Sequence, residues 1–145
     1  MNTIASKVPT AVRIVLGLVF TVFGLNGFLH FLPQPPMSGP PAEFFGLLVA
    51  SGYMLPVAMG TQLGAGLLLL SGRFVPLALA LLAPVIVNIL GFHVFVAKGG
   101  LAVPLIVLTA EVFLAWAYRD AFRPMLSAHV EPRVTQASGT HAAAI

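Results

Sequence analysis

Four long apolar stretches constrain what this chain can fold into more than any other feature of its sequence. They run from about residue 8 to 31, from 53 to 70, from 74 to 96 and from 101 to 118. A helix that crosses a hydrocarbon core about 30 Å thick needs roughly 20 apolar residues, and all four stretches qualify. The sequence therefore predicts an all-α protein embedded in a membrane.

The composition excludes the soluble classes of protein. Hydrophobic residues make up 59% of the 145 residues and charged residues 8%, whereas a soluble domain is about 45–50% apolar and about 25% charged. Seven Lys and Arg with four Asp and Glu are too few to cover a soluble surface. A soluble enzyme, a disordered chain and a nucleic-acid binder are therefore excluded. The chain has no cysteine, which also excludes disulfides and sulfur ligands for zinc or iron–sulfur clusters.

Short polar breaks between the last three stretches predict an antiparallel four-helix bundle. Residues 71–73 and 97–100 are tight turns, so the helices that they join must lie side by side in opposite directions. Small residues recur in the first two stretches at a spacing that predicts close helix packing. These residues are Gly17, Gly24, Gly27, Gly60, Gly64 and Gly66.

The distribution of Lys and Arg predicts the direction of the bundle. Lys98 alone falls on one side of the predicted membrane, and the other six fall on the side of the two termini. Positively charged residues accumulate on the cytoplasmic side of membrane proteins. We therefore expect a multi-pass protein of a bacterial inner membrane with both termini in the cytoplasm. The six residues are Lys7, Arg13, Arg73, Arg119, Arg123 and Arg133.

The segment from residue 32 to 52 is the only long connection, and it is expected outside the cytoplasm. Its prolines, from Pro33 to Pro41, exclude a regular helix over that part. Residues 42–49, which include Glu43, are apolar but too short to span the membrane. One interpretation is a short amphipathic or re-entrant helix that lies across the bundle as a lid. The other is a hydrophobic loop that rests on the lipid surface.

Beyond Pro124 the chain changes character. Its residues become small and polar, so we expect a flexible cytoplasmic tail over 124–145 after a transmembrane domain over 1–123. His129 and His141 in this tail are expected to be solvated. No metal site and no catalytic residue are expected in the chain.

Six polar side chains lie within the apolar stretches. Each needs a hydrogen-bond partner or a function, because a polar group in hydrocarbon costs free energy. Counting about 1.5 Å per residue places all six in the middle or the outer half of the membrane. We therefore predict that they line a ligand-binding pocket that opens outward beneath the proline-rich loop. They are Asn26, His30, Gln62, Asn88, His93 and Glu111.

A purely structural role is the alternative for each of the six. Amide side chains commonly hydrogen-bond between membrane helices, and a histidine near a helix end can serve as a polar cap. Glu111 has no Lys or Arg at its depth, so we expect a neutral, protonated acid. Its hydroxyl would either tie helices together or serve a ligand or a proton transfer.

The spacing of the polar residues supports part of the predicted pocket. Asn26 and His30 are four residues apart and share a helix face. Asn88 and His93 are five apart, which separates them by about 140° around an ideal helix. They converge only if the helix is irregular, and Pro84 supplies a reason because it removes one helical hydrogen bond.

The order of these motifs resembles the DoxX-like family of small four-helix membrane proteins. The first motif is Gly-Leu-Asn-Gly-Phe-Leu-His-Phe-Leu-Pro at residues 24–33, and Ser-Gly-Tyr follows at 51–53. Arg-Phe-Val-Pro at 73–76, Ala-Pro-Val-Ile-Val-Asn at 83–88 and Phe-His at 92–93 complete the resemblance, which covers about residues 13–122. It implies that Asn26, His30, Asn88 and His93 occupy the recurring polar positions of the family. It also implies a likeness to membrane subunits of quinone-linked complexes and a distant one to NACHO-type receptor-assembly chaperones.

Two functions from different classes follow from these observations. The first is a non-catalytic accessory or assembly protein, whose pocket holds a lipid-like molecule or a transmembrane helix of a membrane-protein partner or of a second copy. The alternative is a quinone-reactive subunit of an oxidoreductase complex, in which His30 or His93 bonds a quinone carbonyl and Glu111 supplies a proton. That role requires a partner that carries electrons. Haem is not expected, because both histidines would have to face each other across the bundle.

Overall fold

The computed structural model describes residues 3–130, and within this range the chain forms helices and no strand. The all-α prediction is therefore confirmed. The elements are α1 (Thr3–Leu29), α2 (Pro40–Ala50), α3 (Met54–Ser71), α4 (Val75–Gly91), the π-helix η1 (Phe92–Val96), α5 (Ala102–Ala117), α6 (Arg119–Phe122) and the 3₁₀-helix η2 (Arg123–Leu126).

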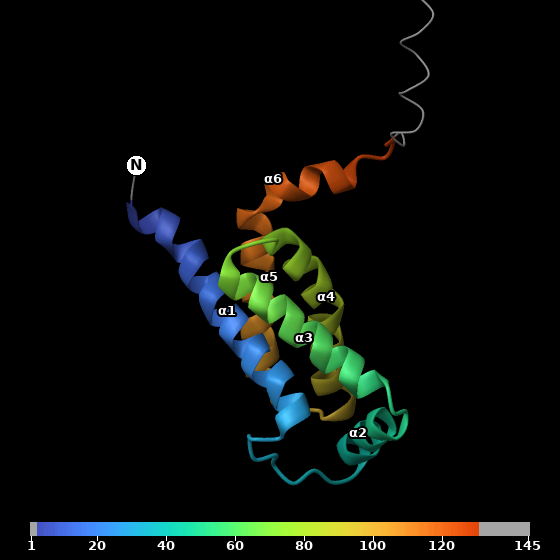
Figure 1. Ribbon diagram of the computed structural model, residues 1–145. Coiled ribbons are helices and arrows are strands. Elements are labelled where there is room, and N and C mark those ends of the chain that lie inside the picture. The colour runs from blue at the N-terminus through green and yellow to red at the C-terminus, as the bar shows by residue number, and fades with distance from the viewer. Residues whose placement is uncertain (1–2, 131–145) are drawn as a thin grey trace, which may run out of the picture.

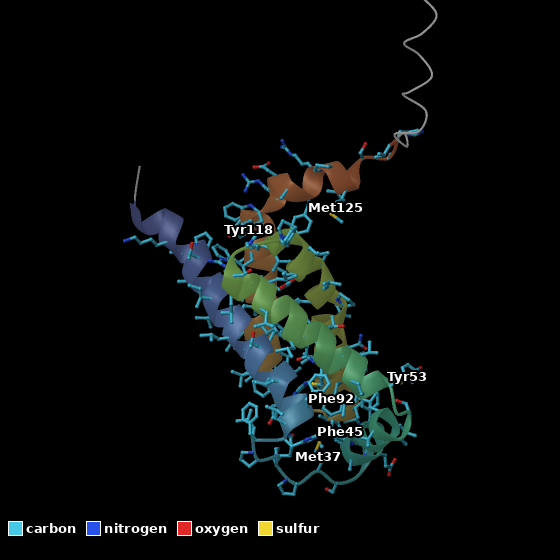
Figure 2. All side chains as sticks on the ribbon, viewed as in Figure 1. Met37, Phe45, Tyr53, Phe92, Tyr118 and Met125 are labelled. Atoms are coloured by element: carbon cyan, nitrogen blue, oxygen red, sulfur yellow. The ribbon has the colours of Figure 1, made fainter. Side chains whose placement is uncertain are left out.

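The four long helices form a bundle in which α1 packs against α3 and α5, and α4 packs against the same two (Figure 1). The N-terminus and α6 lie at one end of the bundle, which we call the terminal end. The helix α2 and the connection 30–39 lie at the opposite end, which we call the loop end (Figure 1). Tyr118 and Met125 mark the terminal end in Figure 2, and Phe45 and Phe92 mark the loop end.

Three helical segments within residues 3–130 are long and apolar enough to cross a membrane. They are Lys7–Leu29, Met54–Ser71 and Val75–Val96, the last of which joins α4 to η1. The 16 residues of α5 extend only about 24 Å at 1.5 Å per residue. Together, α5 and Arg119–Leu126 are long and apolar enough for a fourth span, although the two segments are bent by 75° relative to each other. The fourth predicted stretch therefore ends in a sharp bend near Tyr118.

The segment after the prolines is a helix rather than an irregular loop. Residues 33–38 have no regular structure, and α2 begins with Pro40 and Pro41 in its first turn, where a missing N–H costs little. This helix packs against α3 and η1 at the loop end (Figure 1). The ring of Phe44 lies 5.5 Å from that of Phe92, centroid to centroid.

Glycines bring α1 and α3 into close contact along much of their length. A Cβ atom added to Gly24 would stand 2.5 Å from the backbone nitrogen of Leu63, and one added to Gly66 would stand 2.6 Å from that of Thr21. No larger residue fits at either position without moving a helix. Gly64 has nothing within 4 Å of an added Cβ, so Gly66 and not Gly64 carries the packing in α3.

The packed core of the bundle lies mainly toward the terminal end. Its most deeply buried side chains include Leu16, Leu69, Leu79, Leu82 and Leu114, which come from all four long helices. The side chain of Arg13 closes this end of the α1–α3 contact by donating hydrogen bonds to the carbonyls of Leu69 and Leu70. A cation at the C-terminus of a helix is stabilised by the helix dipole as well as by these bonds.

Candidate functional site

A cavity of about 730 Å³ occupies the loop half of the bundle, under α2. Every long helix contributes to its wall, together with α2, η1 and the connection 30–39. Five lining residues have polar side chains, and the rest of the lining is apolar or glycine. None of the lining residues is Asp, Glu, Lys or Arg. The five are Asn26, His30, Gln34, Gln62 and His93.

Asn26 is held in the last turn of α1 and is only 4% exposed. Its side-chain Oδ1 accepts a hydrogen bond from the backbone N–H of Leu32 at 2.7 Å. This bond holds the chain as it turns out of α1. The Asn26 Nδ2 group makes none of the hydrogen bonds found among residues 3–130, so its two N–H donors remain available to the cavity that the residue lines.

His30 follows α1 and lies at the mouth of the cavity, where its side chain is exposed. Its backbone takes the left-handed conformation, with φ at 51°, and its N–H donates to the carbonyl of Asn26 at 2.9 Å. Few non-glycine residues adopt this conformation, and it terminates the helix at this point. The placement of Asn26 and His30 on one wall agrees with their spacing of four residues.

Gln62 contributes a buried amide from the middle of α3. Its Nε2 approaches the sulfur of Met59 at 3.8 Å, which is a weak contact because a thioether is a poor acceptor. The amide therefore keeps most of its hydrogen-bonding capacity. Since Gln62 lines the cavity, that capacity is directed at whatever occupies it.

His93 reaches the cavity from the π-helix η1. Its Nδ1 lies 2.8 Å from the carbonyl oxygen of Ile89. A carbonyl can only accept a hydrogen bond, so Nδ1 carries the proton, and Nε2 of the neutral ring is left as an acceptor. The imidazole thus complements the amide donors of Asn26 and Gln62.

Asn88 is the first predicted pocket residue that the structure places elsewhere. Its side chain is exposed, and its Nδ2 donates to the carbonyl of Pro84 in its own helix at 2.8 Å. Asn88 therefore does not line the cavity that His93 lines. The five-residue spacing explains this result, since it directs the two side chains to different sides of the helix.

Glu111 is the second predicted pocket residue outside the cavity wall. It is 6% exposed, and its Oε2 has no hydrogen-bond partner among the described residues. It comes four residues after Val107, which does line the cavity, so it lies about one turn deeper on the same face of α5. Its predicted depth within the bundle is consistent with this place, but its predicted membership of the cavity wall is not.

Glu43, which the sequence placed in the lid, is exposed on α2 and does not line the cavity. Phe45 and Val49 of the same helix line it instead. The helix α2 therefore contributes apolar side chains, and not its carboxylate, to the cavity wall.

Sequence reasoning missed Gln34 and the aromatic part of the wall. Gln34 is the one amide among the prolines of the connection 30–39, and that isolation was the available signal. Phe20, Phe23 and Phe28 also line the cavity from α1. No signal distinguished them from lipid-facing residues, because both kinds are equally apolar.

The arrangement offers hydrogen-bond donors and acceptors on uncharged amides and imidazoles within an otherwise apolar chamber. Such a site suits a molecule with an uncharged polar head and an apolar body, because no lining residue balances a charge. Within residues 3–130, no three His, Cys, Asp or Glu side chains lie close enough together to hold a metal ion.

Comparison with known proteins gives one match. A family model described as DoxX matches residues 8–99, a range that begins within α1, ends after η1 and contains all five polar residues of the cavity wall. No curated protein matches the chain, and no solved structure matches it.

Proposed function

The chain belongs to the DoxX family of membrane proteins, and we propose that it is an accessory protein that holds an uncharged, lipid-like molecule in the cavity at the loop end. This family membership confirms the resemblance found in the sequence. With its apolar helices, it makes the chain a multi-pass membrane protein.

One observation carries the proposal. The cavity gathers neutral polar groups from separate helices, Asn26 from α1, Gln62 from α3 and His93 from η1, in a wall that is otherwise apolar. If these groups served only to hold the helices together, they would hydrogen-bond to one another. None of the hydrogen bonds found among residues 3–130 joins any two of the three side chains. Their remaining hydrogen-bonding capacity is therefore available to a ligand.

The size of the cavity favours a small molecule over a partner's transmembrane helix. A helix about 11 Å wide fills about 500 Å³ per turn. The cavity of about 730 Å³ would accept little more than one turn of it. Small-molecule sites in proteins commonly measure about 300–1,000 Å³.

The polar residues of the cavity have different roles in the proposed contacts with the ligand. The N–H groups of Asn26 and Gln62 donate to a carbonyl or hydroxyl oxygen of the ligand head, and Nε2 of His93 accepts from a hydroxyl. The exposed ring of His30 lies at the mouth of the cavity. Phe45 and Val49 of α2 cover the occupant as a lid.

A quinone is a specific member of this ligand class and gives the second candidate function. Its two carbonyl oxygens match the two amide donors, and this match is the observation that favours it. The protein would then serve as the quinone-binding subunit of an oxidoreductase complex, with a partner that carries the electrons.

The distribution of charge supports an orientation with the loop end outside the cytoplasm. The described basic residues at or near the terminal end are Lys7, Arg13, Arg73, Arg119 and Arg123, whereas Lys98 lies at the loop end. Reporter fusions at Pro35 and at Ile145 test this orientation. A C-terminal reporter that is active only outside the cytoplasm would contradict it.

The ligand itself is tested by purifying three forms of the protein in a mild detergent and extracting each with organic solvent for mass spectrometry. The forms are the unaltered chain, Gln62→Leu and the control Asn88→Leu. Losing one hydrogen bond of about 1.4 kcal/mol lowers affinity about tenfold, so Gln62→Leu should lose most of an uncharged amphiphile that the other two retain. Identical extracts of ordinary phospholipid from all three would contradict the proposal. The recovery of a quinone would select the second candidate function.

A further inference from the structure

The exposure of residues along α1 changes beside the cavity. Leu16 and Phe23 are seven residues apart, so they lie on the same face of α1, two turns from each other. Leu16, nearer the terminal end, is 2% exposed, whereas Phe23 is 53% exposed. This face of the helix is covered at one end and uncovered at the other.

The facing helix α5 shows the same change. Val103 and Leu114 are eleven residues apart, close to three full turns, and therefore share a face of α5. Leu114 is fully buried in the same core cluster as Leu16, whereas Val103 at the loop end is 65% exposed. On both α1 and α5, these faces are thus buried in the terminal half and exposed in the loop half.

The uncovered residues on both helices belong to the cavity wall. Phe23 and Val103 each line the cavity, and more than half of each residue is exposed. Two exposed wall residues on these neighbouring helices are what an opening of the cavity between α1 and α5 would produce. On the other side of α1, Gly24 and Gly27 bring that helix close to Leu63 and Met59 of α3.

We propose that this gap between Phe23 of α1 and Val103 of α5 is a lateral portal, through which an uncharged amphiphile enters the cavity from the bilayer. The inference rests on the proposed function and adds the route of entry and the form of the ligand. The head group, with carbonyl or hydroxyl oxygens, reaches Asn26, Gln62 and His93, and the apolar chain passes out between α1 and α5 into lipid.

A quinone and a diacylglycerol both carry this chemistry. The experiment therefore measures the exchange of two probes, a deuterated short-chain benzoquinone and a deuterated short-chain diacylglycerol. Protein in phosphatidylcholine vesicles is first saturated with one unlabelled compound and then mixed with vesicles that carry its deuterated form. The rate of replacement is followed by mass spectrometry of the re-isolated protein. The compound that exchanges saturably identifies the source.

Three variants separate the portal from the binding site. Val103→Trp narrows the gap and should slow exchange about tenfold, and Phe23→Ala widens it and should speed exchange. Val112→Trp is the matched control, since Val112 is also exposed on α5 but does not line the cavity. Its exchange rate should equal that of the unaltered chain.

The outcomes distinguish the two proposals. If neither probe binds the unaltered chain saturably, the proposed function fails and the portal falls with it. If a probe binds but Val103→Trp and Phe23→Ala exchange it at the unaltered rate, the portal is wrong and the binding site stands. If Val112→Trp slows exchange as much as Val103→Trp does, the effect is general and the portal is again wrong.

Discussion

The two sides of α1 show how one helix can close a bundle on one face and leave it open on the other. Toward α3, Gly17, Gly24 and Gly27 remove the side chains that would hold the helices apart, so the contact is close from the terminal end to the cavity. On another face of α1, Leu16 is buried in the core whereas Phe23 is more than half exposed. The cavity is therefore a consequence of where α1 has small residues and where it has large ones.

Replacing Gly24 should give the largest loss of stability, because it disrupts the close contact between α1 and α3. The added methyl group of Gly24→Ala would meet backbone atoms of Leu63 and Met59 within 3 Å, so the helices must separate. We expect a loss of about 3 kcal/mol or more in the free energy of unfolding, at the upper end of overpacking costs. Unfolding by SDS in mixed micelles measures this loss.

Gly64→Ala provides the control for that variant, since an added Cβ at Gly64 meets nothing within 4 Å. It should leave stability unchanged or raise it by up to about 1 kcal/mol through helix propensity. Equal losses from Gly24→Ala and Gly64→Ala would show that the α1–α3 contact is not close.

Buried and exposed positions of α5 differ in what truncation should cost. Leu114→Ala removes a fully buried side chain and should cost about 2 kcal/mol, the low end for Leu→Ala because lipid rather than water surrounds the bundle. Val103→Ala, at an exposed position near the loop end, should change the free energy of unfolding by less than about 0.5 kcal/mol. Similar losses at both positions would mean that α5 packs evenly along its length.

Arg13 should contribute less than the core but more than any other charge near the terminal end. Arg13→Gln removes the charged donor to the carbonyls of Leu69 and Leu70, and a hydrogen bond to a charged group contributes about 1.5 kcal/mol or more. Arg73→Gln is the comparison, because Arg73 is exposed and should matter little. Thermal unfolding of both variants in detergent measures the difference, and an equal midpoint for the two would contradict the capping role.

Glu111→Gln should give the smallest change. The substituted oxygen has no hydrogen-bond partner among residues 3–130, and Glu111 is not part of the cavity wall. We expect a stability change within about 1 kcal/mol and an unaltered amount of co-purified amphiphile. A tenfold loss of the amphiphile would return Glu111 to the binding site that the sequence assigned it.

The sequence was sufficient for the helical class and for the family, because apolar length and a set of ordered motifs carry both. It also located Asn26, His30, Gln62 and His93 near one another, since polar side chains in hydrocarbon are few and their depth follows from helical rise. All four line the cavity.

What the sequence could not provide was the rotation of each helix. Lipid is as apolar as a protein interior, so Leu16 and Phe23 look alike in the sequence although one is buried and the other is exposed. The same ambiguity hid the outward direction of Asn88 and made Gly64 look equivalent to Gly66. Only the packing of neighbouring helices resolves such pairs.

The central claim is that the loop half of the bundle encloses a chamber occupied by one kind of uncharged amphiphile. Photo-cross-linking in native membranes tests it most directly, with benzoylphenylalanine placed either at Val107, which lines the cavity, or at Ile106, which is exposed on the same helix. The account predicts adducts of a single uncharged amphiphile at position 107 and of the bulk phospholipid mixture at position 106. The same phospholipid mixture at both positions, or adducts only with protein at position 107, would contradict it.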